Sequence, residues 1–427
     1  MNRRQFSFLL VSMGISYPWL KSPYSLAQQV NNVNNKVINI LDYGCKAFDP
    51  SDTIVHDNRI SLQKILDYCH EMSSSANKSY SIYIPKGTFY VSSTSLDSSH
   101  GIPGAFCLQI YSNIKLYGEG TLKLLPKQYG VGAFFRILAS DQSNKISNVI
   151  ISGITLDGNN GNQVDGIQAS NILLECANNI QINNVVSKNA NGNGILIRGS
   201  KQINNPVEQV LITGCVVSNC RKIGIQVSQF KNLKIYNNKI SNCSDNGIDI
   251  YGDIGRNPQG LTNGNDFEIY SNNVTNCLNG IFPETVSNGR IFKNTLADIQ
   301  QSAIHVNRIH GMPANIYITE NVIQNIVVAF TITGDMANVI IKNNHVKNVK
   351  DYFFSFGGGK GNASGVIARD NILEVGPAVK AVVRFSGLRV NNIQVNANRI
   401  ISKNNNNQVP LQINNALSLN KNSVSLE

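Results

Sequence analysis

The sequence is poor in charged residues and in tryptophan. Charged residues make up 15% of the 427 positions, and there is one Trp. No apolar run approaches the roughly 20 residues that a helix needs to cross a bilayer. The Lys and Arg residues form no concentrated stripe with interleaved aromatics, which argues against nucleic acid as a partner. No Cys-x-x-Cys occurs among the eight cysteines, so a structural zinc site is not expected.

What the sequence has in abundance is repetition. The stretches 179–197, 232–250 and 266–284 share one pattern, namely a short alternating strand, an Asn, a second apolar strand, a polar turn and Gly-Ile-x-apolar. Such self-similarity is typical of solenoid proteins. The turn position recurs nine times over 245 residues, at a mean interval of about 27, and is occupied by Gly153, Asn184, Cys215, Asn238, Asn272, Asn294, Asn321, Asn344, Asn371 and Asn398.

The periodicity within each repeat predicts strands rather than helices. Apolar residues alternate with period 2 in short runs that are rich in Val and Ile. Three short strands and three turns account for one repeat. The Asn at the turn is predicted to take the left-handed backbone conformation, and its amide to hydrogen-bond along the stack of coils. We therefore predict an all-β fold, a single-stranded right-handed parallel β-helix of about 10–12 coils with an N-terminal capping helix.

Residues 1–27 are expected to be an export signal. Arg3 and Arg4 precede the apolar run Phe8–Ile15, and Ala27 ends a small-residue cleavage site, the pattern of a twin-arginine signal peptide. An ordinary N-terminal anchor is the alternative. We divide the chain into this signal, an N-terminal cap and first coil at 28–95, the β-helix at 96–415 and a C-terminal tail at 416–427. The expected location is the periplasm or the cell exterior.

The net charge indicates a possible class of partner. The formal charge of +11 includes Arg3, Arg4 and Lys21, so the mature chain carries about +8. A modest basic excess suits an acidic polysaccharide, and it equally suits plain solubility.

The cysteines are expected to be mostly structural. Cys220, Cys243 and Cys277 occupy one position in successive repeats, which predicts a stack of buried thiols. Cys45 and Cys69 are the first pair to test for a disulfide.

Three segments near the N-terminus carry a family resemblance. They are Asp-Tyr-Gly at 42–44, an amphipathic helix over 62–69, and Tyr-Ile-Pro-Lys-Gly-Thr-Phe-Tyr at 83–90. Together they resemble the start of the pectate-lyase-like, or rhamnogalacturonase/epimerase-like, right-handed β-helix superfamily. The sequence departs from that pattern at Cys45, where Ala is usual, and in a reduced acidic loop. The resemblance implies carbohydrate binding along one outer face, in a superfamily that includes lyases, hydrolases, epimerases, phage tailspikes and non-enzymes.

The binding face is expected on the Gly-Ile-x-apolar strands. Long insertions follow these strands, and binding residues concentrate on such loops. Alternation then places the ionisable residues Asp249, Tyr251, Glu284 and His305 outward on three consecutive coils, and we predict them to be catalytic. The predicted substrate-binding residues near them are Glu175, Arg198, Gln226, Arg256, Asn307 and Arg308.

One chemistry open to this cluster is glycoside hydrolysis. Asp249 and Glu284 are one coil and two residues apart, roughly 8 Å between Cβ atoms. Two carboxyl groups at such a separation can act as an acid paired with a base or nucleophile. The polygalacturonase motifs, including Gly-His-Gly, are absent.

A polysaccharide lyase or a uronate C5-epimerase is the second possibility. An arginine would neutralise the uronate, and His305 or Tyr251 would take the C5 proton. Alginate epimerases lead one to expect Asp-Pro-His, and the nearest match here is Asp249-Ile250-Tyr251. No cofactor is predicted, except that in a lyase a Ca²⁺ held by Asp249, Asp253 and Glu284 is the alternative to Arg198, Arg256 or Arg308 for neutralising the uronate. The third possibility is a non-catalytic carbohydrate-binding or polysaccharide-assembly protein.

Overall fold

The computed structural model describes residues 37–76, 78–94, 105–128, 134–141, 144–163, 168–199, 206–252, 264–308, 314–358, 362–376, 378–402, 410–420 and 422–426. The expected export signal, Arg256 and Asp253 lie outside these ranges. No helix within them is long and apolar enough to cross a membrane.

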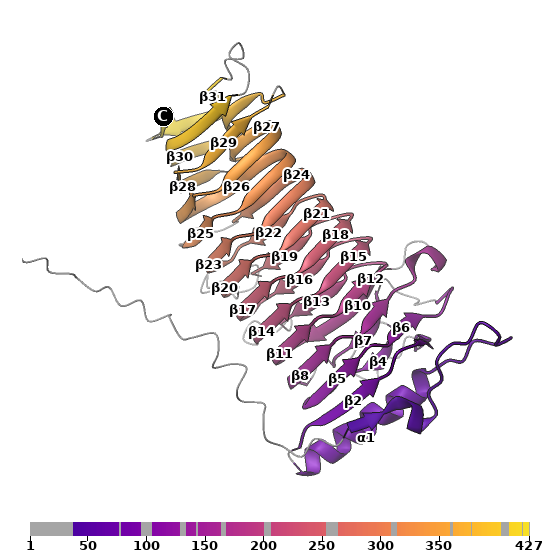
Figure 1. Ribbon diagram of the computed structural model, residues 1–427. Coiled ribbons are helices and arrows are strands. Elements are labelled where there is room, and N and C mark those ends of the chain that lie inside the picture. Colours follow the sequence, from indigo (N-terminus) through magenta and orange to yellow (C-terminus); the bar gives the residue numbers. More distant parts are fainter. Residues whose placement is uncertain are drawn as a thin grey trace, which may run out of the picture. The chain divides into compact units, whose positions relative to one another are not determined.

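The described strands form three columns, and within each column every strand pairs in parallel with those of the coils before and after it (Figure 1). We call the columns walls 1, 2 and 3, in the order in which the chain visits them. Wall 1 consists of β1 (Val37–Asn39), β2 (Tyr80–Ile84), β5 (Ile114–Gly118), β8 (Ile146–Ser152), β11 (Ala177–Asn183), β14 (Val207–Thr213), β17 (Phe230–Tyr236), β20 (Asn265–Tyr270), β23 (Ser287–Phe292), β25 (Ile316–Thr319) and β28 (Ala363–Arg369).

Walls 2 and 3 follow in each coil. Wall 2 consists of β3 (Thr88–Val91), β6 (Thr121–Leu124), β9 (Thr155–Asp157), β12 (Val186–Lys188), β15 (Val216–Cys220), β18 (Lys239–Cys243), β21 (Asn273–Cys277) and β29 (Ile372–Val375). Wall 3 consists of β4 (Ala105–Gln109), β7 (Phe134–Ala139), β10 (Gln168–Glu175), β13 (Ile195–Arg198), β16 (Ile225–Ser228), β19 (Ile248–Tyr251) and β22 (Ile281–Glu284).

Longer strands in the C-terminal coils belong to more than one wall. They are β24 (Thr295–Asn307), β26 (Val322–Lys342), β27 (His345–Phe356) and β30 (Ala381–Ser402). The last strands, β31 (Gln412–Asn420) and β32 (Ser423–Leu426), both pair with β30. The expected start of a C-terminal tail at residue 416 therefore falls inside a paired strand. The predicted right-handed parallel β-helix is confirmed.

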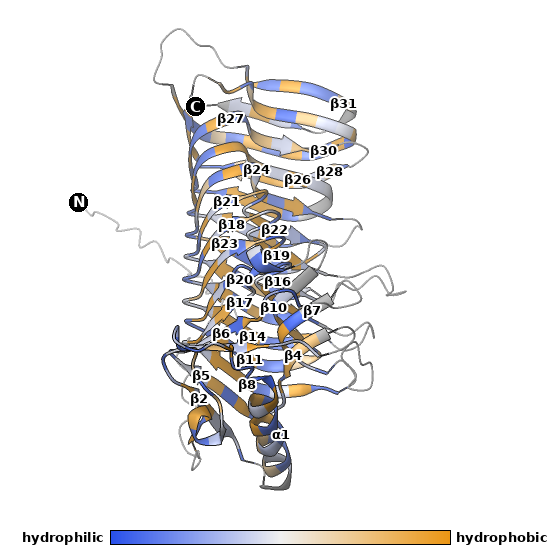
Figure 2. Ribbon diagram, turned by 90° about the vertical axis from the view of Figure 1, so that its right-hand side faces the viewer, coloured by the Kyte–Doolittle hydropathy of each residue, from blue (hydrophilic) through white to orange (hydrophobic). Residues whose placement is uncertain are grey.

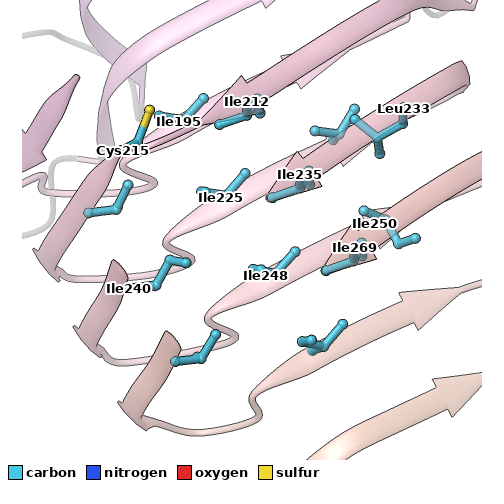
Figure 3. Close-up of a cluster of buried hydrophobic side chains, with 14 of the residues drawn as sticks. Ile195, Ile212, Cys215, Ile225, Leu233, Ile235, Ile240, Ile248, Ile250 and Ile269 are labelled. Carbon is cyan, nitrogen blue, oxygen red and sulfur yellow. The ribbon is translucent and has the colours of Figure 1, made fainter. Parts of the chain in front are cut away.

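The interior consists of stacked aliphatic side chains, since the inward residue of each strand lies over its counterpart in the next coil. Ile195, Ile225 and Ile248 form one such row, and all are fully buried (Figure 3). The alternation of hydrophobic and hydrophilic residues along the strands is visible in Figure 2. Each buried methylene contributes about 0.8 kcal/mol, and each coil buries its apolar surface only against its neighbours.

The glycine of Gly-Ile-x-apolar is required by close approach of the next coil. A Cβ atom at Gly224 would lie 2.6 Å from the carbonyl oxygen of Gly247 and 3.1 Å from the Cys243 Sγ. A side chain there would separate the coils, so the repeated glycine is explained by the packing of coils and not by a catalytic role.

A ladder of seven buried asparagines runs along the turn between walls 1 and 2. Each one except the last donates its backbone N–H and its Nδ2 to the Oδ1 of the next, at 2.8–3.1 Å, and the members are Asn238, Asn272, Asn294, Asn321, Asn344, Asn371 and Asn398. The predicted amide stack is confirmed. The predicted left-handed backbone is found at the turn residue Asn184, whereas at the ladder it belongs to the residue before each asparagine, for example Ser271 and Lys293. The side chain that follows is thereby turned into the core.

The N-terminal end is covered by α1 (Arg59–Ala76), which lies beside β2 in Figure 1 and follows the short 3-10 helix η2 (Ile40–Tyr43). The predicted apolar face is buried, and it consists of Leu62, Ile65, Leu66 and Cys69. A second 3-10 helix, η4, spans Asn160–Asn162.

All eight cysteines are buried free thiols, Cys45 and Cys69 included. Cys220, Cys243 and Cys277 lie in register on consecutive strands of wall 2, which confirms the predicted thiol stack.

Candidate active site

Two rows of outward-facing positions run along wall 3, and they contain the predicted cluster. We call them row A (Leu196, Gln226, Asp249, Phe282 and His305) and row B (Arg198, Ser228, Tyr251, Glu284 and Asn307). Neighbours within a row are one coil apart, about 4.8 Å. The predicted alternation is therefore correct for this wall, and Asp249, Tyr251, Glu284 and His305 share it.

Asp249 is the most perturbed acid of the cluster. Its side chain is 5% exposed although its position faces outward. The Asn246 Nδ2 donates to its Oδ2 at 2.7 Å, whereas its Oδ1 meets no hydrogen-bond partner among the described residues. Burial raises the pKa of Asp249 to about 7, with smaller increases from the charges of Glu284 and Asp245. The carboxyl group can therefore hold a proton near neutral pH.

Glu284 lies in the next coil, opposite Tyr251 in row B. The Asn307 Nδ2 donates to its Oε1 at 3.0 Å. Burial raises the pKa of Glu284, and this donor opposes the increase because it favours the ionised form. The two acids consequently have different environments, which is the arrangement that separates the roles of an acid and a base.

His305 is held as a neutral imidazole at neutral pH. Burial lowers its pKa to about 4. Its Nε2 lies 3.3 Å from the Thr333 Oγ1, and its ring centroid is 4.6 Å from that of Phe282. Phe282 thus lies in row A between the acid Asp249 and the imidazole.

Two predicted binding arginines are engaged with other protein groups. Arg198 forms an ion pair with Glu175, which is only 2% exposed. Arg308 is 3% exposed, and its Nη1 donates to the Val286 carbonyl oxygen at 2.9 Å and to the Ser287 Oγ at 3.2 Å. Glu175 and Arg308 are enclosed between neighbouring coils, and the substrate-binding role expected of them stays a prediction.

Sequence reasoning missed several polar residues around Asp249. Asn246 and Asn279 precede the Gly-Ile pair of their coils, and the Asn279 Nδ2 donates to the Asn246 Oδ1 at 2.9 Å. On the other side, the Asn193 Nδ2 donates to the Gln226 Oε1 at 2.8 Å. The signal was present in the sequence, since Asn-Gly-Ile occurs at 193–195, 246–248 and 279–281. A buried arginine, Arg136, close to Glu175 and Arg198, was also missed.

Within the described part of the chain, no group of three His, Cys, Asp or Glu side chains is placed to hold a metal ion. The third ligand of the expected Ca²⁺ site, Asp253, lies outside that part.

Comparisons with known proteins agree with this fold. Residues 137–261 match a family model described as the right handed beta helix region. A stretch of 129 residues is 29% identical to the mannuronan C5-epimerase AlgE6 of Azotobacter vinelandii. That match covers 30% of this chain and only 14% of the epimerase.

Solved structures show the same likeness over most of the chain. The A-module of the A. vinelandii AlgE6 epimerase has a TM-score of 0.59 at 15% identity, covering 90% of this chain and 99% of the module. The tailspike protein of E. coli bacteriophage HK620, solved in complex with a pentasaccharide, has a TM-score of 0.63 at 14% identity. This second match covers 85% of this chain and 66% of the tailspike chain. At these identities the likeness concerns the fold.

Proposed function

We propose that this protein is an exported enzyme that hydrolyses glycosidic bonds in a polysaccharide. The observation that carries the proposal is the carboxyl pair on wall 3. Asp249 and Glu284 lie on adjacent coils of one outer wall, and the pKa of each is raised. Paired carboxyl groups in different environments are what acid and base roles require.

Asp249 is the general acid in this proposal. With a pKa of about 7 it retains a proton at neutral pH and donates it to the leaving glycosidic oxygen as the C–O bond breaks. Glu284, whose ionised form is favoured by the Asn307 donor, accepts a proton from the attacking water. The Cβ atoms of the two acids are roughly 8 Å apart. Carboxyl groups held at a similar separation leave room for that water and favour inversion at the anomeric carbon.

Phe282 and His305 provide an apolar surface beside the two acids. Their rings contact each other, and Phe282 is partly exposed. The C–H face of a pyranose ring packs well on such a surface, and we assign the sugar at the cleavage point to it.

Known relatives support a carbohydrate substrate. The HK620 tailspike was solved with bound oligosaccharides, and AlgE6 is named for its action on mannuronan. Neither likeness specifies the sugar. The basic mature chain suits an acidic polysaccharide, while the cluster itself contributes acidic groups.

C5-epimerisation or lyase chemistry is the second candidate. It is favoured by the neutral His305, by Tyr251 on the same wall and by the similarity to AlgE6. It is disfavoured by the arginines, because Arg198 and Arg308 already bind protein groups. A uronate carboxylate beside the ionised Glu284 would then be repelled.

The test is incubation of the mature protein with acidic and neutral polysaccharides. Hydrolysis yields new reducing ends without unsaturated, ultraviolet-absorbing products. Unsaturated products would establish a lyase, and solvent deuterium incorporated at C5 without cleavage would establish an epimerase. Tight binding without any product would replace the proposal with a binding or assembly role.

A further inference from the structure

Asp249 lies where two chains of amide groups converge. One chain begins at the Ser302 backbone N–H, which donates to the Asn279 Oδ1 at 3.2 Å. The Asn279 Nδ2 donates to the Asn246 Oδ1 at 2.9 Å, and the Asn246 Nδ2 donates to the Asp249 Oδ2 at 2.7 Å. Every donor in this chain points toward the carboxyl group.

The second chain reaches Asp249 from the opposite side. The Asn193 Nδ2 donates to the Gln226 Oε1 at 2.8 Å. This hydrogen bond leaves the Gln226 amide nitrogen to face Asp249, which is its neighbour in row A. Gln226 lowers the pKa of Asp249 by hydrogen bonding, as Asn246 does, because both favour the ionised form.

We propose that Asn246, Asn279, Gln226 and Asn193 are positioning residues that hold Asp249 for proton transfer, with Oδ2 as the acceptor of the Asn246 amide and Oδ1 as the atom that carries the proton. This inference rests on the proposed hydrolase function. Two features of the geometry support it. The Asn246 donor approaches Oδ2, and the buried Oδ1 has no hydrogen-bond partner among the described residues.

The amide network opposes other groups that act on the protonation of Asp249. Burial and the acids Glu284 and Asp245 favour the protonated form, and the amides favour the ionised form. Tyr251 faces the site from the same strand. Removing one of these amide donors leaves the nearby charges unchanged and raises the pKa of Asp249.

The experiment compares two substitutions of a buried asparagine by leucine. Asn246→Leu removes a donor to Asp249, whereas Asn272→Leu removes an amide of the structural ladder that hydrogen-bonds to other asparagines and to the Ile235 carbonyl oxygen. The readout is the titration of Asp249 by carbon-13 NMR of labelled Asp side chains, assigned by the resonance that Asp249→Asn loses. We expect Asn246→Leu to raise the midpoint by about one pH unit, and Asn272→Leu to leave it in place.

Two further variants test the proposal even if Asn246→Leu fails to fold. Asn279→Leu, one step further from the carboxyl group, should raise the midpoint by less, and Gln226→Leu should raise it through the other chain. Unshifted midpoints in all three variants would overturn the proposal, as would equal shifts in Asn246→Leu and Asn272→Leu.

The pH–rate profile separates this inference from the proposed function. The alkaline limb of activity should move upward in Asn246→Leu by the same amount as the titration. If the Asp249 titration shifts but the protein hydrolyses no polysaccharide, the positioning role of the amides stands and the hydrolase proposal is rejected. If Asp249→Asn abolishes activity but the amide variants leave the Asp249 titration unchanged, the hydrolase proposal stands and the positioning role of the amides is rejected.

Discussion

The amide ladder between walls 1 and 2 and the amide chains on wall 3 differ in how they end. The ladder between walls 1 and 2 repeats one hydrogen-bond pattern from Asn238 to Asn398 without meeting a charge. The amides on wall 3 converge on the carboxyl group of Asp249. The same side-chain chemistry therefore stabilises coils in one place and modifies an acid in the other. What separates them is the group at the end of the chain.

The largest effect is expected from the acids themselves. Asp249→Asn or Glu284→Gln should reduce hydrolysis by about 10²–10⁴-fold, the range for loss of general acid–base catalysis. The ladder is untouched in both variants, so the circular dichroism spectrum and cooperative unfolding should persist. Reducing-end assays measure the loss. Near-normal turnover in either variant would remove that residue from the catalytic pair.

The largest stability effect is expected from the ladder. Asn272→Leu deletes the acceptor of Asn238 and the donor to Asn294, and each buried group left without a partner costs about 1–3 kcal/mol. We expect a loss of about 3–5 kcal/mol in the free energy of unfolding. Denaturant titration measures it. A loss no larger than that of Asn246→Leu would mean that the two chains do not differ in structural importance.

The pH dependence of stability should reveal the buried titrating groups of wall 3. The pKa of Asp249 is about 7 in the folded protein and takes its ordinary value of 3.8 in the unfolded chain, so between these values the native state holds the extra proton and stability falls as pH rises. His305 has a folded pKa of about 4 against 6.5, so between these values the unfolded state holds the extra proton and stability falls as pH falls.

The two contributions oppose each other in the wild-type protein between about pH 4 and 6.5. Asp249→Asn should therefore make stability rise with pH in this window, and His305→Gln should make it fall, by up to about 1.4 kcal/mol per pH unit in each case. Unfolding midpoints at three pH values suffice. Slopes of the same sign in both variants would contradict the assigned environments.

Substrate binding should depend on Phe282 in row A. Phe282→Ala removes the ring that contacts His305 and, in our proposal, one sugar. Loss of such stacking is worth about 0.5–1.5 kcal/mol, so KM should rise by about 2- to 10-fold with an unchanged pH profile. A shifted profile would indicate that Phe282 acts on the acids and not on the sugar.

The smallest effect is expected on the exposed face of wall 1. Glu268 forms ion pairs with Lys234 at 3.2 Å and with Arg290 at 3.7 Å. Glu268 and Lys234 are partly exposed and Arg290 is exposed, so solvent screens both pairs. Glu268→Gln should change the free energy of unfolding by less than about 1 kcal/mol and leave activity intact. A larger loss would show that surface pairs contribute to the stacking of coils alongside the amides.

Most of the architecture could be predicted because the repeat makes distant residues neighbours. Residues one repeat apart, such as Asn272 and Asn294 or Cys243 and Cys277, occupy equivalent positions in adjacent coils. Alternation likewise predicted which side of wall 3 carries Asp249 and Glu284. Asn246 and Asn279 were not predicted, because they precede the strands, where alternation no longer specifies direction.

The sequence by itself determined the coil, the turn asparagines and the outward rows, since period-2 strands that repeat about every 27 residues stack in only one register. Only the tertiary structure decided how deeply each outward residue is buried. Asp249 and Arg308 occupy outward or turn positions, yet both are enclosed by residues from neighbouring coils. Burial and partners set the pKa of a side chain, and both depend on contacts between coils that no local pattern records.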